Sequence, residues 1–221
     1  ETAPPSRSSS SSLRAAGTPS SAFRVAVARG RVKGTALRAG LAWFAQTYGE
    51  AGLTRLADLA SPELRAMLRP ADPALGLIAS GWYDTQLIGE LLGLAEHVAQ
   101  PLDPAELRLR IADAVARDNV GGVYRALFRL VASPKLLEAN AQRVWRTYVD
   151  EGTLSVEITG DGAFRANVRG WSRHSANVCR FLRPLLERLL LEVGYRSVAV
   201  ERLECMASGS TQCAFEGKWA P

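Results

Sequence analysis

Residues 204–219 read ECMASGSTQCAFEGKW and place Cys205 and Cys213 on either side of a glycine-centred turn. This spacing predicts a β-hairpin that brings both sulfur atoms to one point. The third cysteine, Cys179, lies in the apolar segment before the hairpin, so all three belong to the final quarter of the chain. Converging thiolates suit a soft metal ion such as Zn²⁺. The spacing alone also allows three free cysteines buried in an ordinary core.

The hairpin ends a region in which the hydrophobic pattern has the period of β-strands. Alternation over 154–159, a turn at 160–162 and a partner segment at 164–168 predict a first hairpin. A helix is expected over 175–193, with an apolar stripe broad enough to cover a sheet. Pro184 lies inside that segment, so it either kinks the helix or marks a later start. The second hairpin pairs 197–205 with 213–219.

Helical periodicity dominates the chain before Gly152. Ser-Pro pairs at 61–62 and 133–134 mark two helix starts. The expected helices are 34–49, 53–59, 61–68, 85–98, 103–117, 120–131 and 133–148, preceded by a short strand at 23–27. We therefore predict an α+β fold in which a helix-rich N-terminal two thirds packs on an antiparallel sheet made of two hairpins flanking a long helix. Residues 1–21, rich in Ser and Pro, are expected to form a disordered tail, and 22–221 a single domain.

Composition narrows the class of protein. The chain has 221 residues, of which 47% are hydrophobic, enough to bury a sizeable core. Its net charge of +5 is concentrated in residues 1–40, which hold seven basic side chains against Glu1 alone. The folded domain is therefore not expected to bind nucleic acid. Without a membrane-spanning apolar run or a secretion signal, a cytoplasmic protein without disulfides is expected.

From about residue 134 to 219 the chain resembles the 4-vinyl-reductase-type small-molecule-binding domain, as found in phenol- and xylene-responsive transcription activators. The resemblance rests on the strand 198–205, which ends in Cys205, and on the Cys-Ala-Phe-Glu-Gly-Lys ending at 213–218. The whole chain also resembles a many-copy myxobacterial family, which implies no activity. The first resemblance implies a structural zinc site with the ligands Cys179, Cys205, Cys213 and Glu157.

The same superfamily is similar in fold to heme-based sensors of NO and O₂ and to subunits of the TRAPP tethering complex. The segment from 32–37 to the Tyr-Gly-Glu at 48–50 resembles the opening of the heme sensors. A heme sensor needs an axial histidine, and neither His97 nor His174 lies in a recognisable ligand motif. The His and Trp that hold phenol in the aromatic sensors also lack a clear counterpart, so a different ligand is expected.

Aromatic side chains are dense in the helices that would wall a ligand pocket, although each of them also suits an ordinary core. No catalytic motif is present, so we expect no enzyme. The main hypothesis is a sensory module that binds a small apolar molecule, carries structural zinc and forms a homodimer. The alternatives are a protein-interaction scaffold of the TRAPP type and, less favoured, a heme-based gas sensor. The candidate pocket residues are Trp145, Tyr148, Phe128 and Tyr124.

Overall fold

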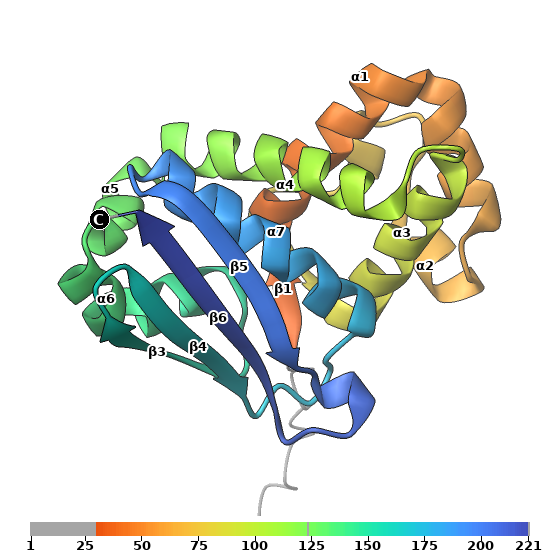
Figure 1. The fold of residues 1–221 in the computed structure, drawn as a ribbon. Coiled ribbons are helices and arrows are strands. Elements are labelled where there is room, and N and C mark those ends of the chain that lie inside the picture. Colours follow the sequence, from red (N-terminus) through yellow and green to blue (C-terminus); the bar gives the residue numbers. More distant parts are fainter. Residues whose placement is uncertain (1–29, 123, 221) are drawn as a thin grey trace, which may run out of the picture.

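A computed structural model describes residues 30–122 and 124–220. Two parts lie side by side: a helical half, residues 30–121, and a sheet half, residues 124–220 (Figure 1). The tail expected over 1–21 and the strand expected over 23–27 lie outside the described residues. None of the described helices combines the length and the apolar character needed to cross a membrane.

The helical half opens with a small antiparallel β-pair that the sequence pattern did not predict. β1 (Arg31–Lys33) pairs with β2 (Trp82–Asp84), with Val32 opposite Tyr83. Between them lie α1 (Gly34–Leu59), α2 (Pro62–Met67) and a 3₁₀ turn (Pro73–Gly76). α1 joins the two helices expected over 34–49 and 53–59 across a kink at Gly49, where φ is 69° and ψ is −174°. That backbone conformation is open almost only to glycine.

Three of the helices that follow begin directly after a capping side chain. α3 (Thr85–Val98) is capped by Asp84, and α4 (Pro104–Gly121) by Asp103, whose carboxylate accepts from two backbone N–H groups. α6 (Pro134–Tyr148) is capped by Ser133 and starts with proline, as predicted.

The prediction of one continuous helix over 120–131 is wrong. α4 runs on to Gly121, and the chain then forms only the short α5 (Arg125–Phe128) and a 3₁₀ turn (Arg129–Val131). The physical reason is the adjacent Gly122, which leaves the helical region with ψ of −149°.

The C-terminal part forms the sheet that the alternating pattern predicts. Its strands are β3 (Thr153–Gly160), β4 (Ala163–Arg169), β5 (Arg196–Glu204) and β6 (Gln212–Ala220), paired antiparallel in the order β3-β4-β6-β5. Between the hairpins runs α7 (Ala176–Glu192), which includes Pro184 without ending there. The predicted α+β fold class is confirmed.

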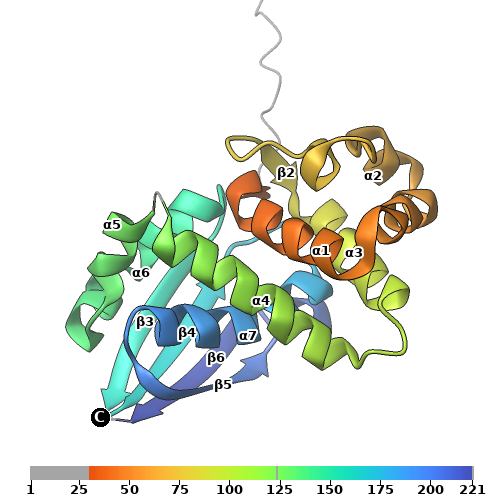
Figure 2. The same cartoon turned by 90° about the horizontal axis from the view of Figure 1, so that it is seen from above.

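Helices cover one face of this sheet (Figure 2). α7 packs against β5 and α6 against β3, while α4 contacts α7 from the side of the helical half. The buried residues accordingly fall into two clusters. The sheet core includes Phe164, Val200 and Phe215, and the helical core includes Phe44 and Leu56. The two cores meet where α4 and α7 lie together.

Candidate functional site

An apolar cavity of about 190 Å³ lies where the helical core meets the sheet core. Side chains from both halves line it, among them Leu41 and Ile111 from the helical half and Val178, Leu182 and Phe215 from the sheet half. Dry cavities of similar size and lining in other proteins hold a single aromatic ring or a xenon atom. The junction of the two cores can therefore take a compact molecule.

Only a few polar groups interrupt this apolar wall. The Tyr148 hydroxyl donates to Asn119 Oδ1 at 2.8 Å, and Asn119 Nδ2 donates to the carbonyl oxygen of Val115 at 2.8 Å. Burial, reinforced by Tyr124 and Asp118, raises the pKa of Tyr148. Tyr148 therefore stays a neutral phenol, held in place by a buried amide.

Two tryptophans form another part of the wall. The rings of Trp145 and Trp171 meet edge to face, with centroids 5.1 Å apart. Trp145 Nε1 donates to the carbonyl oxygen of Glu151 at 3.0 Å. Trp171 Nε1 is buried and has no hydrogen-bond partner among the described residues.

Three of the four pocket residues expected from the sequence lie on this cavity: Trp145, Tyr148 and Phe128. Tyr124 does not line the cavity; its ring contacts that of Tyr148 at a tilt of 55°, with centroids 5.4 Å apart. The sequence reasoning missed Asn119 and Trp171, because neither belongs to a local pattern that points to a pocket.

A second constellation lies at the end of the sheet where β5 leads into β6. Cys179, in the first turn of α7, has its sulfur 3.4 Å from that of Cys213, at the start of β6. His174 Nε2 lies 3.2 Å from Cys213 Sγ and 3.9 Å from Cys205 Sγ. All four ligand atoms of this thiol–imidazole cluster lie within 4.8 Å of one another.

The cluster favours one ionised sulfur. A hydrogen bond from Cys179 lowers the pKa of Cys213, and His174 and the backbone N–H of Met206 act in the same direction against the cost of burial. The pKa of Cys179 is raised, first because it donates that hydrogen bond and then because it is buried. Within the pair, ionisation is therefore directed to Cys213, with the Cys179 thiol as its hydrogen-bond donor.

The structure brings together the three cysteines that the sequence singled out, and it adds His174 in place of Glu157. Glu157 lies on β3 opposite Arg165, two strands away from β6 and three residues along from Leu154. Leu154 pairs with Val168, which in turn pairs with Cys213. Strands lie about 4.8 Å apart and residues along a strand about 3.3 Å apart. Glu157 is therefore on the order of 10 Å from Cys213 across the sheet and on the order of 10 Å from it along the strands.

His174 lies in no recognisable ligand motif, so the sequence did not assign it to this cluster. Its position five residues before Cys179, at the entry to a helix, is the signal that could have identified it. Metal ligation by the three cysteines and Glu157 stays a prediction from the sequence.

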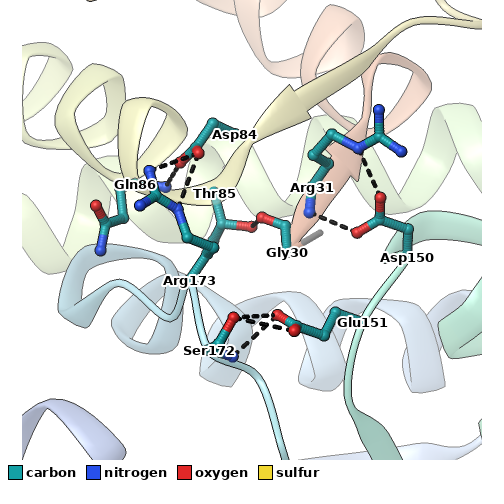
Figure 3. Close-up of polar contacts among 9 residues, drawn as sticks. All are labelled: Gly30, Arg31, Asp84, Thr85, Gln86, Asp150, Glu151, Ser172 and Arg173. Atoms are coloured by element: carbon teal, nitrogen blue, oxygen red, sulfur yellow. Dashed lines mark hydrogen bonds and ion pairs between the residues drawn. The ribbon is translucent and has the colours of Figure 1, made fainter. Parts of the chain in front are cut away.

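A polar network connects the two halves at one edge of their junction (Figure 3). The backbone N–H and the Nε of Arg31 donate to the two carboxylate oxygens of Asp150, each at 2.6 Å. Thr85 Oγ1 donates to the carbonyl oxygen of Gly30 at 2.6 Å. β1 is therefore tied both to α3 and to the segment that leads into β3. The loop after β4 adds contacts of Ser172 with Glu151 and of Arg173 with Asp84.

Solved structures of H-NOX domains are similar in fold to this chain. An H-NOX protein from K. algicida, described as Fe(II) and unliganded, matches with a TM-score of 0.60 and 15% identity over 86% of this chain and 97% of that one. An oxygen-binding H-NOX domain related to soluble guanylate cyclases matches with a TM-score of 0.55 and 11% identity, over 86% and 95%. An H-NOX protein from S. oneidensis matches with a TM-score of 0.60 and 8% identity, over 86% and 96%. No family model and no curated protein matches the chain.

These neighbours overturn three expectations from the sequence. The resemblance to the 4-vinyl-reductase-type domain is wrong, because the structural neighbours are H-NOX domains. Structural zinc as the cofactor is wrong on the same comparison, since these neighbours are described by heme and Fe(II). The zinc-bearing sensor of small apolar molecules falls with them, and the heme-based gas sensor, kept as an alternative, agrees better with the neighbours. The likeness to these solved structures shows that this chain has the H-NOX fold.

Proposed function

We propose that the chain is a sensory module of the H-NOX type, in which a compact molecule in the central cavity sets how the helical half and the sheet half sit against each other. The observation that carries the proposal is the cavity itself, which is lined from both halves. A molecule bound there contacts α1 and α4 on one side and α6 and α7 on the other. Its binding energy therefore depends on the relative position of the two halves, which is the requirement for a ligand to shift a conformational equilibrium.

The polar network of Figure 3 supports this assignment from outside the cavity. The Arg31–Asp150 and Arg173–Asp84 pairs join the halves at this edge, and Thr85 holds Gly30 beside them within the helical half. Polar contacts also cross the junction from Tyr148 to Asn119 and from Asn177 to the carbonyl oxygen of Gly89. A junction held by a few polar contacts and otherwise filled by apolar side chains allows small shifts of one half against the other.

Heme is the cofactor that the fold suggests, because these neighbours are described by heme and Fe(II). Proteins hold heme iron through His, Cys, Met or Tyr. Among the described residues that line the cavity, none is His, Cys or Met. The chain's two histidines lie elsewhere, His97 near the end of α3 and His174 in the thiol–imidazole cluster. Tyr148 is engaged with Asn119 and its raised pKa opposes the tyrosinate form. The residues present do not fit an axially ligated heme.

The first experiment measures binding with acetophenone, a compact ketone with one aromatic ring. We expect saturable binding by calorimetry, lost in Leu182→Trp, which fills the cavity, and kept in Leu203→Trp, which changes an exposed side chain on β5. Hydrogen–deuterium exchange should show slower exchange in both α4 and α7 on binding. Binding that survives Leu182→Trp, or protection confined to one half, would contradict the proposal.

The second experiment decides between this proposal and the heme-based gas sensor. Purified chain is titrated with hemin, reduced and exposed to carbon monoxide, and its visible absorption is recorded. We expect no sharp stoichiometric Soret band. A one-to-one complex whose Soret band shifts with carbon monoxide would refute the non-heme assignment and establish the gas sensor in its place.

A further inference from the structure

The thiol–imidazole cluster holds two sulfur atoms in direct contact. Cys179 Sγ lies 3.4 Å from Cys213 Sγ, and both side chains are fully buried. The two cysteines are 34 residues apart in the sequence, one in the first turn of α7 and the other at the start of β6. A disulfide brings its sulfurs to about 2.05 Å, so the pair needs to close by only roughly 1 Å. The fold therefore places these two thiols where a small movement can join them.

The polar groups of the cluster converge on Cys213. Its sulfur accepts from Cys179 at 3.4 Å and from the backbone N–H of Met206 at 3.5 Å, and His174 Nε2 lies 3.2 Å away. Hydrogen-bond donors around one sulfur favour its charged form, and the thiolate is the form of cysteine that attacks an electrophile. Cys213 is therefore placed as the nucleophile of the pair, with Cys179 as the thiol that follows it.

A short surface turn lies against the Cys213 sulfur. It is the 3₁₀ turn Met206–Ser208, which projects from the end of the sheet between β5 and β6 (Figure 1). Its first residue contacts the sulfur through the backbone N–H, and its other two residues are exposed. Surface segments of this kind open at a small fraction of the free energy of global unfolding. Opening of the turn gives a small molecule access to Cys213 while the sheet stays folded.

We propose that a hydroperoxide, ROOH, converts Cys179 and Cys213 into a reversible disulfide. The Cys213 thiolate attacks the terminal oxygen, the O–O bond breaks, and RO⁻ leaves and takes up a proton. The Cys179 thiol then loses its proton and attacks the sulfur of the new sulfenic acid, from which hydroxide leaves and is protonated to water. In sum, two thiols and ROOH give one disulfide, ROH and H₂O, with the thiols oxidised and the peroxide reduced. A dithiol reverses the reaction by thiol–disulfide exchange.

The cross-link would join two elements of the cavity wall. Val178 precedes Cys179 directly and Phe215 lies two residues after Cys213, and both line the cavity. The disulfide therefore fixes the start of α7 against β6 beside the cavity. Oxidation needs no molecule in the cavity, so it is tested separately from the proposed function.

The test exposes the reduced wild-type chain to tert-butyl hydroperoxide under native conditions and then alkylates the remaining thiols in denaturant. We expect two of the three cysteines to escape alkylation and dithiothreitol to restore both. Trypsin releases Cys179 within 174–180 and both hairpin cysteines within 203–218. We expect these peptides to be linked, with fragment ions that assign the link to Cys213. Three free thiols after treatment, or a link that involves Cys205, would overturn the inference.

Cys205→Ser is the matched control, because it removes a buried thiol from the same cluster and leaves the contacting pair intact. This variant should form the cross-link as wild type does. Cys179→Ser should instead stop at the sulfenic acid on Cys213, which dimedone labels. Loss of the cross-link in a folded Cys205→Ser variant, checked by circular dichroism, would contradict the assignment of the pair. The wild-type peptide map decides the question if a variant does not fold.

Native mass spectrometry separates a redox pair from a metal site. The purified reduced chain is weighed under native conditions before the peroxide is added. We expect the mass of the polypeptide alone and, after oxidation, a mass lower by two hydrogen atoms. A bound metal ion that keeps all three thiols from reacting with the peroxide would refute the inference.

Discussion

Truncation of Phe215 and of Phe164 compares two aromatic side chains on adjacent strands, only one of which borders the cavity. Phe215 on β6 is 1% exposed and lines the cavity. Phe164 on β4 is 2% exposed, stacks on Trp219 with centroids 5.7 Å apart and covers Gly217. A Cβ placed on Gly217 would lie 1.9 Å from Phe164, which shows how closely that ring is packed.

The expected losses of stability follow from this difference. Phe→Ala in a core costs about 3–5 kcal/mol, and the cost rises with the packing contacts that are lost. Phe215 already faces empty space on one side, so we expect about 3 kcal/mol for Phe215→Ala and about 5 kcal/mol for Phe164→Ala. For a chain of this length the melting temperature should fall by roughly 6–12 °C and 10–20 °C respectively.

Urea unfolding and differential scanning calorimetry measure both losses, and a binding assay measures the cavity. Phe215→Ala should also bind 1-acetylnaphthalene, a probe one ring larger than acetophenone, whereas Phe164→Ala should not. Equal losses of stability, or a larger loss for Phe215→Ala, would refute the reasoning from packing. Binding of the larger probe by Phe164→Ala would refute the placement of the cavity.

Three further changes have expected outcomes. Hydrogen bonds lower the pKa of Cys213, so its ionisation stabilises the fold fully above the ordinary cysteine pKa of about 8.5. This stabilisation decreases as the pH falls from there toward the lowered pKa. In Cys213→Ser, the free energy of unfolding measured in urea should therefore change less with pH across that range. Asp150→Asn breaks the ion pair with Arg31 and should cost about 1–3 kcal/mol in urea unfolding, and a loss within error would show that the network of Figure 3 does not hold the junction. Gly49→Ala should cost about 1–3 kcal/mol of stability because φ is +69° at this position. Gly121→Ala, in an uncrowded helical position, should gain up to about 1 kcal/mol. Thermal melts that rank the two variants the other way would show that α1 does not kink at Gly49.

The sheet and most helices follow from local signals in the sequence. The alternation over 154–159 and the Gly-Asp-Gly turn determine the first hairpin, and the cap and proline at 133–134 determine the start of α6. α3 covers the predicted residues 85–98. These elements could be predicted because their signals lie within one turn of helix or one hairpin.

Features that depend on contacts between distant segments could not be predicted. β1 and β2 have three residues each, too few for any period, and they exist because they pair with one another. His174 joins the cysteines only after β4, α7 and the last hairpin have assembled. Asn119 reaches the cavity because it pairs with Tyr148, which lies 29 residues away.

The resemblance drawn from the last hairpin was misleading for a related reason. A cysteine-and-turn motif describes one corner of the sheet, whereas the H-NOX likeness lies in the path of 86% of the chain at 8–15% identity. Identity that low leaves few matching motifs to recognise.

The division of the interior into two clusters has a consequence for how the protein melts. Each cluster is packed within itself, and the void at their boundary removes contacts that would otherwise join them. Without a molecule in the cavity, the helical half can unfold at a lower temperature than the sheet half. The calorimetric enthalpy of unfolding then exceeds the van't Hoff enthalpy. A guest that bridges the boundary makes the two transitions merge, so the cooperativity of melting itself reports occupancy.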